Sequence, residues 1–445
     1  MILPAQTSIL ALGTIYTIVS IIPFIHVRTW ELTSHSDSRS VCKLFIMYDS
    51  NQNPLRSLIP VAFDSPVLLK SILAIAARHM GNGGQSFCPS GFPSGAENFP
   101  YDNALLFKYR AIQGLSQALN NLELSQRDTT VASAFLLIFL DLVESGSDRW
   151  NYHLEGTKKL VAQTQPQTGV QQNLGQTVQG IRGFITRQLY LYVPETGFDV
   201  LMADSCYNSR IDTFGTTFTH PGLLSDSTLL QQPTTSLHKS VEQSYLGCPE
   251  ELLDALRYFS FYRDVLVSPE PVDEMAFFSY VHNMGTILQS TRNYDCYPWA
   301  SSLSRQPSSS TTQDTNMLYN LAQSYKIASL IYGNCVLAAY VGDTTSQSEL
   351  VDELIRIIDA LKNDEALFKC ILWPMFVAGL ESQRQTQRDF VTRCLEKFWF
   401  ETKCLNVVNA GNILQRFWRQ EDQQKTSLSH WIFNIGQLGN DWLLI

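Results

Sequence analysis

Apolar residues recur at three- and four-residue spacing along most of this chain, and this spacing limits the possible folds more than any other feature. In the carboxy-terminal third, 316–341 and 349–361 each place their large apolar residues on one face of a helix. The segment 131–144 is apolar on all sides, as expected of a helix at the centre of a bundle. Apart from short ambiguous runs such as 189–193, no alternating pattern is long enough to seed a sheet. We therefore predict an all-α protein.

Helix start and stop signals divide this pattern into separate helices. Ser65-Pro66 opens one that ends near Gly81, with proline at the first helical position, where a missing N–H costs little. A second runs over about 103–122 and places five large apolar residues on one face: Leu105, Tyr109, Ile112, Leu115 and Leu119. Long Ser/Thr/Gln-rich loops are predicted at about 163–179, 204–243 and 301–315. The expected fold is a multi-helix domain over 44–445, a bundle of roughly a dozen helices.

The first 43 residues form an apolar amino-terminal segment that differs from the rest. Residues 1–27 carry no Lys, Arg, Asp or Glu, and 9–24 are almost entirely apolar. A run of this length approaches the roughly 20 residues needed to span a bilayer. The basic residues Arg28, Arg39 and Lys43 would then keep the body on the cytoplasmic side. A transmembrane helix, a buried helix and an incorrect start all remain open interpretations.

Charge and cysteine spacing argue against nucleic-acid and metal sites. The chain has 32 Lys+Arg against 41 Asp+Glu, a net charge of −9, without the basic clusters that contact phosphates. Its 9 cysteines include no CxxC pair, and none of its 8 histidines lies three or four residues from another. We predict reduced, mostly buried thiols and no metal-binding or DNA-binding residues in this chain.

No enzyme signature is present, whether GxSxG, HExxH, GxGxxG or a phosphate-binding loop. His153 and Glu155 are a conceivable acid–base pair, but no nucleophile can be placed beside them, and a structural histidine at a helix start is the simpler interpretation. No catalytic or cofactor-binding residue is therefore predicted.

Two side-chain groups near the carboxy terminus have both a functional and a structural interpretation. Arg384, Arg388 and Arg393 could bind an anion, but acidic residues interleave with them, which favours a salt-bridged helix face. Aromatic residues between 373 and 418 could line a ligand pocket, but aromatic stripes at helical spacing are more often core.

The segment 367–381 is predicted as one helix with Pro374 and Gly379 inside it. An internal proline removes a helical hydrogen bond and crowds the preceding turn, so we expect a kink there. Pro374 and Gly379 are therefore the candidate hinge of the domain.

Several segments occur together in a recognisable order. They are Asn53-Pro54-Leu55-Arg56, Ser65-Pro66 with the helix that follows, Thr129-Thr130-Val131-Ala132, His153-Leu154-Glu155-Gly156, Gly247-Cys248-Pro249-Glu250-Glu251, Leu372-Trp373-Pro374-Met375-Phe376 and Phe417-Trp418. This order resembles the fungal-specific transcription factor domain, the regulatory region of zinc-cluster (C6 finger-like) transcription regulators, from about 44 to 419.

The resemblance implies a transcription regulator in the nucleus, acting through other transcription proteins or a small-molecule effector, with a homodimer as one arrangement. Family members bind zinc and DNA through a six-cysteine cluster that precedes this region. Residues 1–43 contain a single cysteine, Cys42, so no zinc cofactor and no direct DNA contact are expected from this chain. A helical enzyme with an unrecognised site, or a regulator anchored to a membrane through 9–24, are the alternatives.

Overall fold

The computed structural model describes residues 41–49, 53–87, 99–121, 123, 128–145, 150–163, 185, 247–267, 273–304, 314–342, 346–424 and 431–434. Within these ranges every regular element is a helix and no strand occurs, which confirms the all-α class. Thirteen of the helices in this part of the chain have seven or more residues, as expected for a bundle of roughly a dozen.

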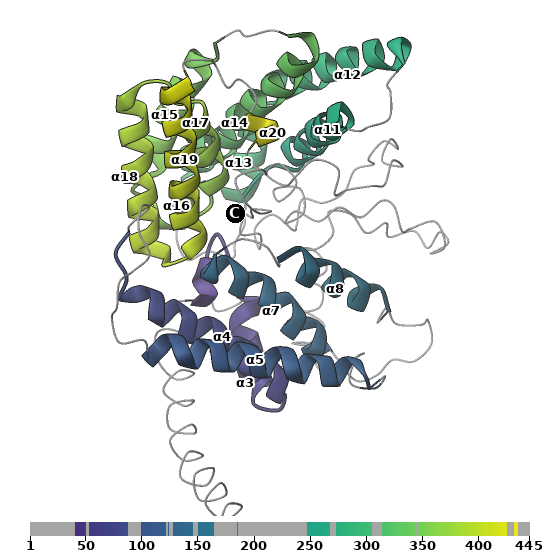
Figure 1. The fold of residues 1–445 in the computed structure, drawn as a ribbon, viewed down its shortest axis with the longest axis vertical. Coiled ribbons are helices and arrows are strands. Elements are labelled where there is room, and N and C mark those ends of the chain that lie inside the picture. The colour runs from purple at the N-terminus through teal and green to yellow at the C-terminus, as the bar shows by residue number, and fades with distance from the viewer. Residues whose placement is uncertain are drawn as a thin grey trace, which may run out of the picture.

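The amino-terminal helices form one half of the molecule, the lower part of Figure 1. These helices are α3 (Pro54–Ala62), α4 (Pro66–Gly83), α5 (Phe99–Leu119), α7 (Asp128–Glu144) and α8 (Trp150–Gln163). Every residue of α7 from Thr130 to Val143 is buried, as its all-round apolar sequence predicts. Helices α4, α8 and, to a lesser extent, α5 pack against it.

The carboxy-terminal helices form the other half, in the upper part of Figure 1. They are α11 (Glu250–Val267), α12 (Glu274–Asn293), α13 (Cys296–Ser304), α14 (Thr315–Val341), α15 (Ser348–Leu361), α16 (Glu365–Phe368), α17 (Leu372–Leu380), α18 (Gln385–Thr402), α19 (Leu405–Gln424) and α20 (Trp431–Asn434). Helix α14 packs against α11, α12, α13, α15 and α17. All nine residues of α17 are buried, so this short helix lies inside the carboxy-terminal half.

Two side-chain amides bind backbone carbonyls of the opposite half. Asn82 of α4 donates from Nδ2 to the carbonyl oxygen of Lys403 at 2.8 Å, and also to that of Val143 within its own half at 2.9 Å. Asn409 of α19 donates to the carbonyl of Ser145 at 2.7 Å. Because carbonyls at helix ends have no helical donor, these amides satisfy groups that burial would otherwise leave unpaired. The bonds thereby fix how the two halves meet.

Some sequence predictions concern residues that the structure does not describe. The apolar segment 9–24 and the predicted loop 204–243 lie outside the described residues, as does the loop 163–179 apart from residue 163, which ends α8. Of the loop predicted at 301–315, residues 301–304 belong to α13 and Thr315 begins α14. None of the helices in the described ranges is long and apolar enough to cross a membrane.

Candidate regulatory site around helix α17

The predicted single helix over 367–381 is wrong, because the structure has two helices there. Helix α16 ends at Phe368 and α17 begins at Leu372. Asp364 caps α16 by accepting hydrogen bonds from the backbone N–H groups of the next turn, at 3.0 and 3.1 Å. Pro374 is the third residue of α17, a position whose N–H would have no helical acceptor. It therefore lies in the first turn of a helix and does not kink one.

The break between the two helices leaves the carbonyl of Cys370 without a helical donor, and α14 provides a donor. In a continuous helix the N–H of residue 374 would bind the carbonyl of Cys370, but proline has no N–H. The hydroxyl of Tyr325 donates to this carbonyl instead. The Tyr325 ring is fully buried and stacks on Trp373, with ring centroids 6.3 Å apart. Tyr325 thus compensates for the bond that Pro374 cannot make.

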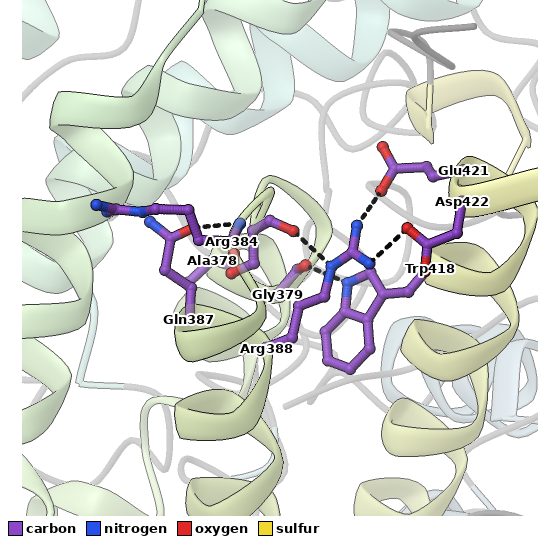
Figure 2. A network of polar contacts seen from close by, with 9 residues as sticks. Ala378, Gly379, Arg384, Gln387, Arg388, Trp418, Glu421 and Asp422 are labelled. Carbon is purple, nitrogen blue, oxygen red and sulfur yellow. Dashed lines mark hydrogen bonds and ion pairs between the residues drawn. The ribbon is translucent and has the colours of Figure 1, made fainter. Parts of the chain in front are cut away.

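Gly379 lies where α17 and α19 approach closely (Figure 2). A Cβ atom at this position would lie 2.6 Å from Cδ1 of Leu414, a buried residue of α19 with little room to move. The indole nitrogen of Trp418, also on α19, donates to the Gly379 carbonyl at 2.9 Å. Glycine at 379 is therefore required for close packing in this structure; whether it also acts as a hinge stays a prediction.

Arg388 of α18 joins the segment after α17 to the last turn of α19. Its Nε donates to the carbonyl of Ser382 at 2.9 Å. Its two terminal nitrogens donate to Asp422 and Glu421, each at 2.9 Å, as the dashed lines in Figure 2 show. The guanidinium also lies 5.5 Å from the ring centroid of Trp418. A single buried arginine thus holds three segments; we call Arg388, Glu421 and Asp422 the arginine clamp.

Three arginines were predicted to share a salt-bridged helix face. Two of them, Arg384 and Arg388, form ion pairs with residues of other helices. Arg384 forms an ion pair with Asp352 of α15. Arg388 pairs with α19, as described above. Their carboxylate partners come from 32 to 34 residues away, not from the interleaved acids on α18. Spacing along one helix contains no signal that could have identified them.

The carboxy-terminal end of α17 has a second polar cluster around Glu381. The indole nitrogen of Trp431 donates to its Oε1 at 2.7 Å, and the thiol of Cys335 donates to the same oxygen at 3.3 Å. Burial raises the pKa of Cys335 well above its usual value, and the neighbouring carboxylate raises it further. Cys335 is consequently a protonated donor and not a nucleophile.

The structure separates the acid–base pair considered from the sequence. His153 Nε2 lies 3.7 Å from Oδ2 of Asp141, whereas Glu155 accepts from Lys158 at 2.8 Å. All seven cysteines in the described ranges are buried and free, in line with the predicted reduced thiols. In the same ranges no three His, Cys, Asp or Glu residues are arranged to hold a metal ion.

The aromatic residues considered as a pocket lining belong mostly to the core. Six of the eight are buried: Trp373, Phe376, Phe398, Trp399, Phe417 and Trp418. Phe390 is half-buried, and Phe400 is exposed. The core interpretation therefore fits better than a ligand pocket.

Comparison with known proteins assigns this helical body to a family. A family model described as "Fungal specific transcription factor domain" matches residues 38–445. The chain belongs to the fungal specific transcription factor domain family. The resemblance inferred from the order of helix-capping and packing segments is thus confirmed.

One curated relative aligns with nearly all of this fungal transcription factor domain. It is the acriflavine sensitivity control protein acr-2 of Neurospora crassa, 23% identical over 429 residues. The alignment covers 92% of this chain and 66% of the relative. The chain thus spans slightly less than two thirds of the length of that relative. No solved structure matches the chain.

Proposed function

We propose that this chain is the regulatory domain of a fungal transcription regulator that acts in the nucleus. The observation that carries the proposal is the family match over residues 38–445. The chemistry of the described residues supports a binding role and not an enzymatic one. Burial raises the pKa of Cys370 and Cys404 to about 12, so these thiols stay protonated near neutral pH. The polar groups around α17 bind one another and join helices.

Regulation on this proposal acts through α17 and its contacts. A partner protein or a small effector that prefers one of two packings of this region would shift the balance between them. The arginine clamp is a suitable control point because its two ends differ in exposure. The Arg388 side chain is 8% exposed, whereas that of Asp422 is 66% exposed and open to competition from an added carboxylate.

DNA contact and zinc binding are proposed to come from outside this chain. Within the described ranges we find no metal cluster, and the chain as a whole has a net charge of −9. Such a charge opposes association with phosphates. A separate DNA-binding segment or a partner polypeptide would bring the domain to its genes, and this domain would set the output.

A reporter assay tests the proposal. The whole chain is fused to an unrelated DNA-binding domain and expressed in a fungal reporter strain, together with a fluorescent fusion that reports location. We expect nuclear fluorescence and reporter transcription that differs several-fold from the DNA-binding domain alone. Arg388→Lys should change this output, whereas Arg384→Lys, on an exposed ion pair, should not. A stable fusion that is excluded from the nucleus, or that leaves transcription at the control level, would contradict the proposal.

A further inference from the structure

A groove of about 630 Å³ opens between α18 and α19, which lie side by side in Figure 1. Five residues of α18 and four of α19 line it, and all of them except Trp418 are polar or charged. Sites for small molecules have volumes of about 300–1,000 Å³, so the groove is large enough for one. Its polar lining suits a charged ligand better than an apolar one. We call it the α18/α19 groove.

The floor of the groove already binds carboxylates of the chain itself. Arg388 and Trp418 are the most buried of the lining residues. Figure 2 shows the Arg388 guanidinium donating to Asp422 and Glu421, the bonds of the arginine clamp. Asp422 is itself a lining residue, and its side chain is exposed. It therefore marks a position at Arg388 that the carboxylate of a ligand can take by displacing it.

Two further arginines line the groove, one on each helix. Arg393 of α18 and Arg419 of α19 are exposed. In the part of the chain that the structure describes, Arg393 has no hydrogen bond or ion pair, and Arg419 donates to Gln415 alone, at 3.5 Å. Guanidinium groups offer paired N–H donors that match a carboxylate. The α18/α19 groove thus holds unused donors for an anion on both of its walls.

The acidic side chains of the groove have partners of their own. Asp389 accepts from Gln385 at 2.7 Å, and Asp422 accepts from Arg388 at 2.9 Å. The lining therefore has three arginines against two aspartates, a local excess of positive charge on a chain whose net charge is −9. Such a local excess attracts anions to this part of an otherwise acidic surface.

The positions of the two unused arginines suit a ligand with two separated negative groups. Only two residues separate α18 from α19, so the helices run antiparallel. Arg388 lies over the Trp418 ring, which places these two residues at one level of the groove. Arg393 follows Arg388 by five residues and Arg419 follows Trp418 by one, in opposite directions along the groove. At about 1.5 Å per residue, their backbones lie about 9 Å apart along it. A linear dicarboxylate can bridge this separation.

We propose that the α18/α19 groove binds a small linear dicarboxylate. One carboxylate takes the place of Asp422 at Arg388 and is also bound by Arg419, and the other is bound by Arg393. The inference rests on the proposed function and deepens it, because the ligand opens one of the bonds between α18 and the last turn of α19. It thereby stabilises the packing in which Asp422 is released.

Isothermal titration calorimetry of the purified full chain tests this site, with adipate and suberate as the probes. Ionic strength is held constant and low, because salt screens exposed charges. We expect dissociation constants in the high-micromolar to millimolar range, since the groove is open to solvent. Hexanoate, which has one carboxylate, should bind at least about ten-fold more weakly than adipate because it leaves one wall of the groove without a partner.

Substitutions in the lining identify the groove as the place of binding. Arg393→Gln and Arg419→Gln should each weaken adipate binding by about ten-fold. The matched control Arg416→Gln, exposed on α19 but outside the lining, should leave the affinity unchanged. Asp422→Asn should strengthen binding several-fold, because it removes the carboxylate that competes for Arg388. Circular dichroism melting of each variant shows that its fold is intact.

Several results would overturn the proposal. They are absence of binding at millimolar adipate and suberate, equal binding of hexanoate, and wild-type affinity in both Arg393→Gln and Arg419→Gln. An acidic peptide that competes with adipate and binds far more tightly would also overturn it, since a protein segment would then be the occupant. The titration requires no transcription. A chain that binds adipate but leaves the reporter at the control level would therefore contradict the proposed function and not the site.

Discussion

The hydroxyl of Tyr325 donates to the carbonyl of Cys370, the acceptor that Pro374 leaves without a helical donor. The two residues lie 45 positions apart, and the bond connects α14 to the break between α16 and α17. The break is therefore a satisfied structural feature, since Tyr325 and Cys370 are both buried and their polar groups bind each other. It also places Trp373 on the Tyr325 ring, so proline, aromatic stack and hydrogen bond form one unit.

Removal of the Tyr325 hydroxyl should destabilise the domain. Tyr325→Phe keeps the ring but leaves the buried Cys370 carbonyl without a donor, and we expect a loss of about 1–3 kcal/mol in the free energy of unfolding. Urea unfolding followed by circular dichroism measures this difference. Tyr319→Phe on the same helix is the control, since its partner Gln323 is only partly buried, and its cost should stay within about 0.5 kcal/mol. Equal effects of the two variants would contradict the role given to Tyr325.

Pro374→Ala should change stability little, because residue 374 lies in the first turn of α17. An internal proline costs about 3 kcal/mol, whereas at this position we expect a change below about 1 kcal/mol. Thermal unfolding of the variant measures it. A gain of several kcal/mol would mean that the proline strains a continuous helix. An unchanged output in the reporter strain would count against a hinge role for Pro374.

Gly379→Ala should separate α17 from α19, since its Cβ would lie 2.6 Å from Leu414. Overpacking of this kind costs about 1–3 kcal/mol, and we expect Leu414→Ala to relieve part of it in the double variant. Denaturant unfolding of the single and double variants gives the coupling. Gly285→Ala is the control, because Gly285 lies within α12 and no atom lies within 4 Å of the Cβ atom that the substitution adds. It should be neutral or stabilise by up to about 1 kcal/mol.

Arg388→Lys should disrupt the arginine clamp although it keeps the positive charge. Lysine cannot direct donors to Ser382, Asp422 and Glu421 at once, so we expect a loss of about 1–3 kcal/mol. Arg384→Lys, on an exposed ion pair, should cost less than about 0.5 kcal/mol. Unfolding at low and high salt measures both. If the two variants lost the same stability, the clamp would be no more than a surface ion pair.

Glu421 should make the stability depend on pH. Burial raises the pKa of its carboxyl above the usual 4.5, while the charge of Arg388 opposes the rise. The folded state then binds the proton more tightly than the unfolded state. This contribution to stability is fully present below pH 4.5 and is lost as the pH rises through the folded-state pKa. We expect the free energy of unfolding of Glu421→Gln to fall less steeply with rising pH than that of the wild type, when both are measured from about pH 4 upward. A parallel pH profile for wild type and variant would contradict this.

The local pattern of the sequence was sufficient for the helical class and for one central element. The segment 131–144 is apolar on all sides, so it could remove all of its side chains from water only in the centre of a bundle. Helix α7 is buried there. Proline after serine at 65–66 located the start of α4 for a similarly local reason. The order of such segments was enough to indicate the family.

Tertiary structure alone decided which faces and partners these helices have. Helical periodicity placed Leu105 and Tyr109 on one face, but close packing of the small residues opposite turned that face outward. Arg388 donates to Glu421 and Asp422 on another helix, and Tyr325 donates to the Cys370 carbonyl. Secondary structure follows from interactions within a few residues, whereas these contacts depend on how helices distant in sequence pack, which no short-range pattern contains.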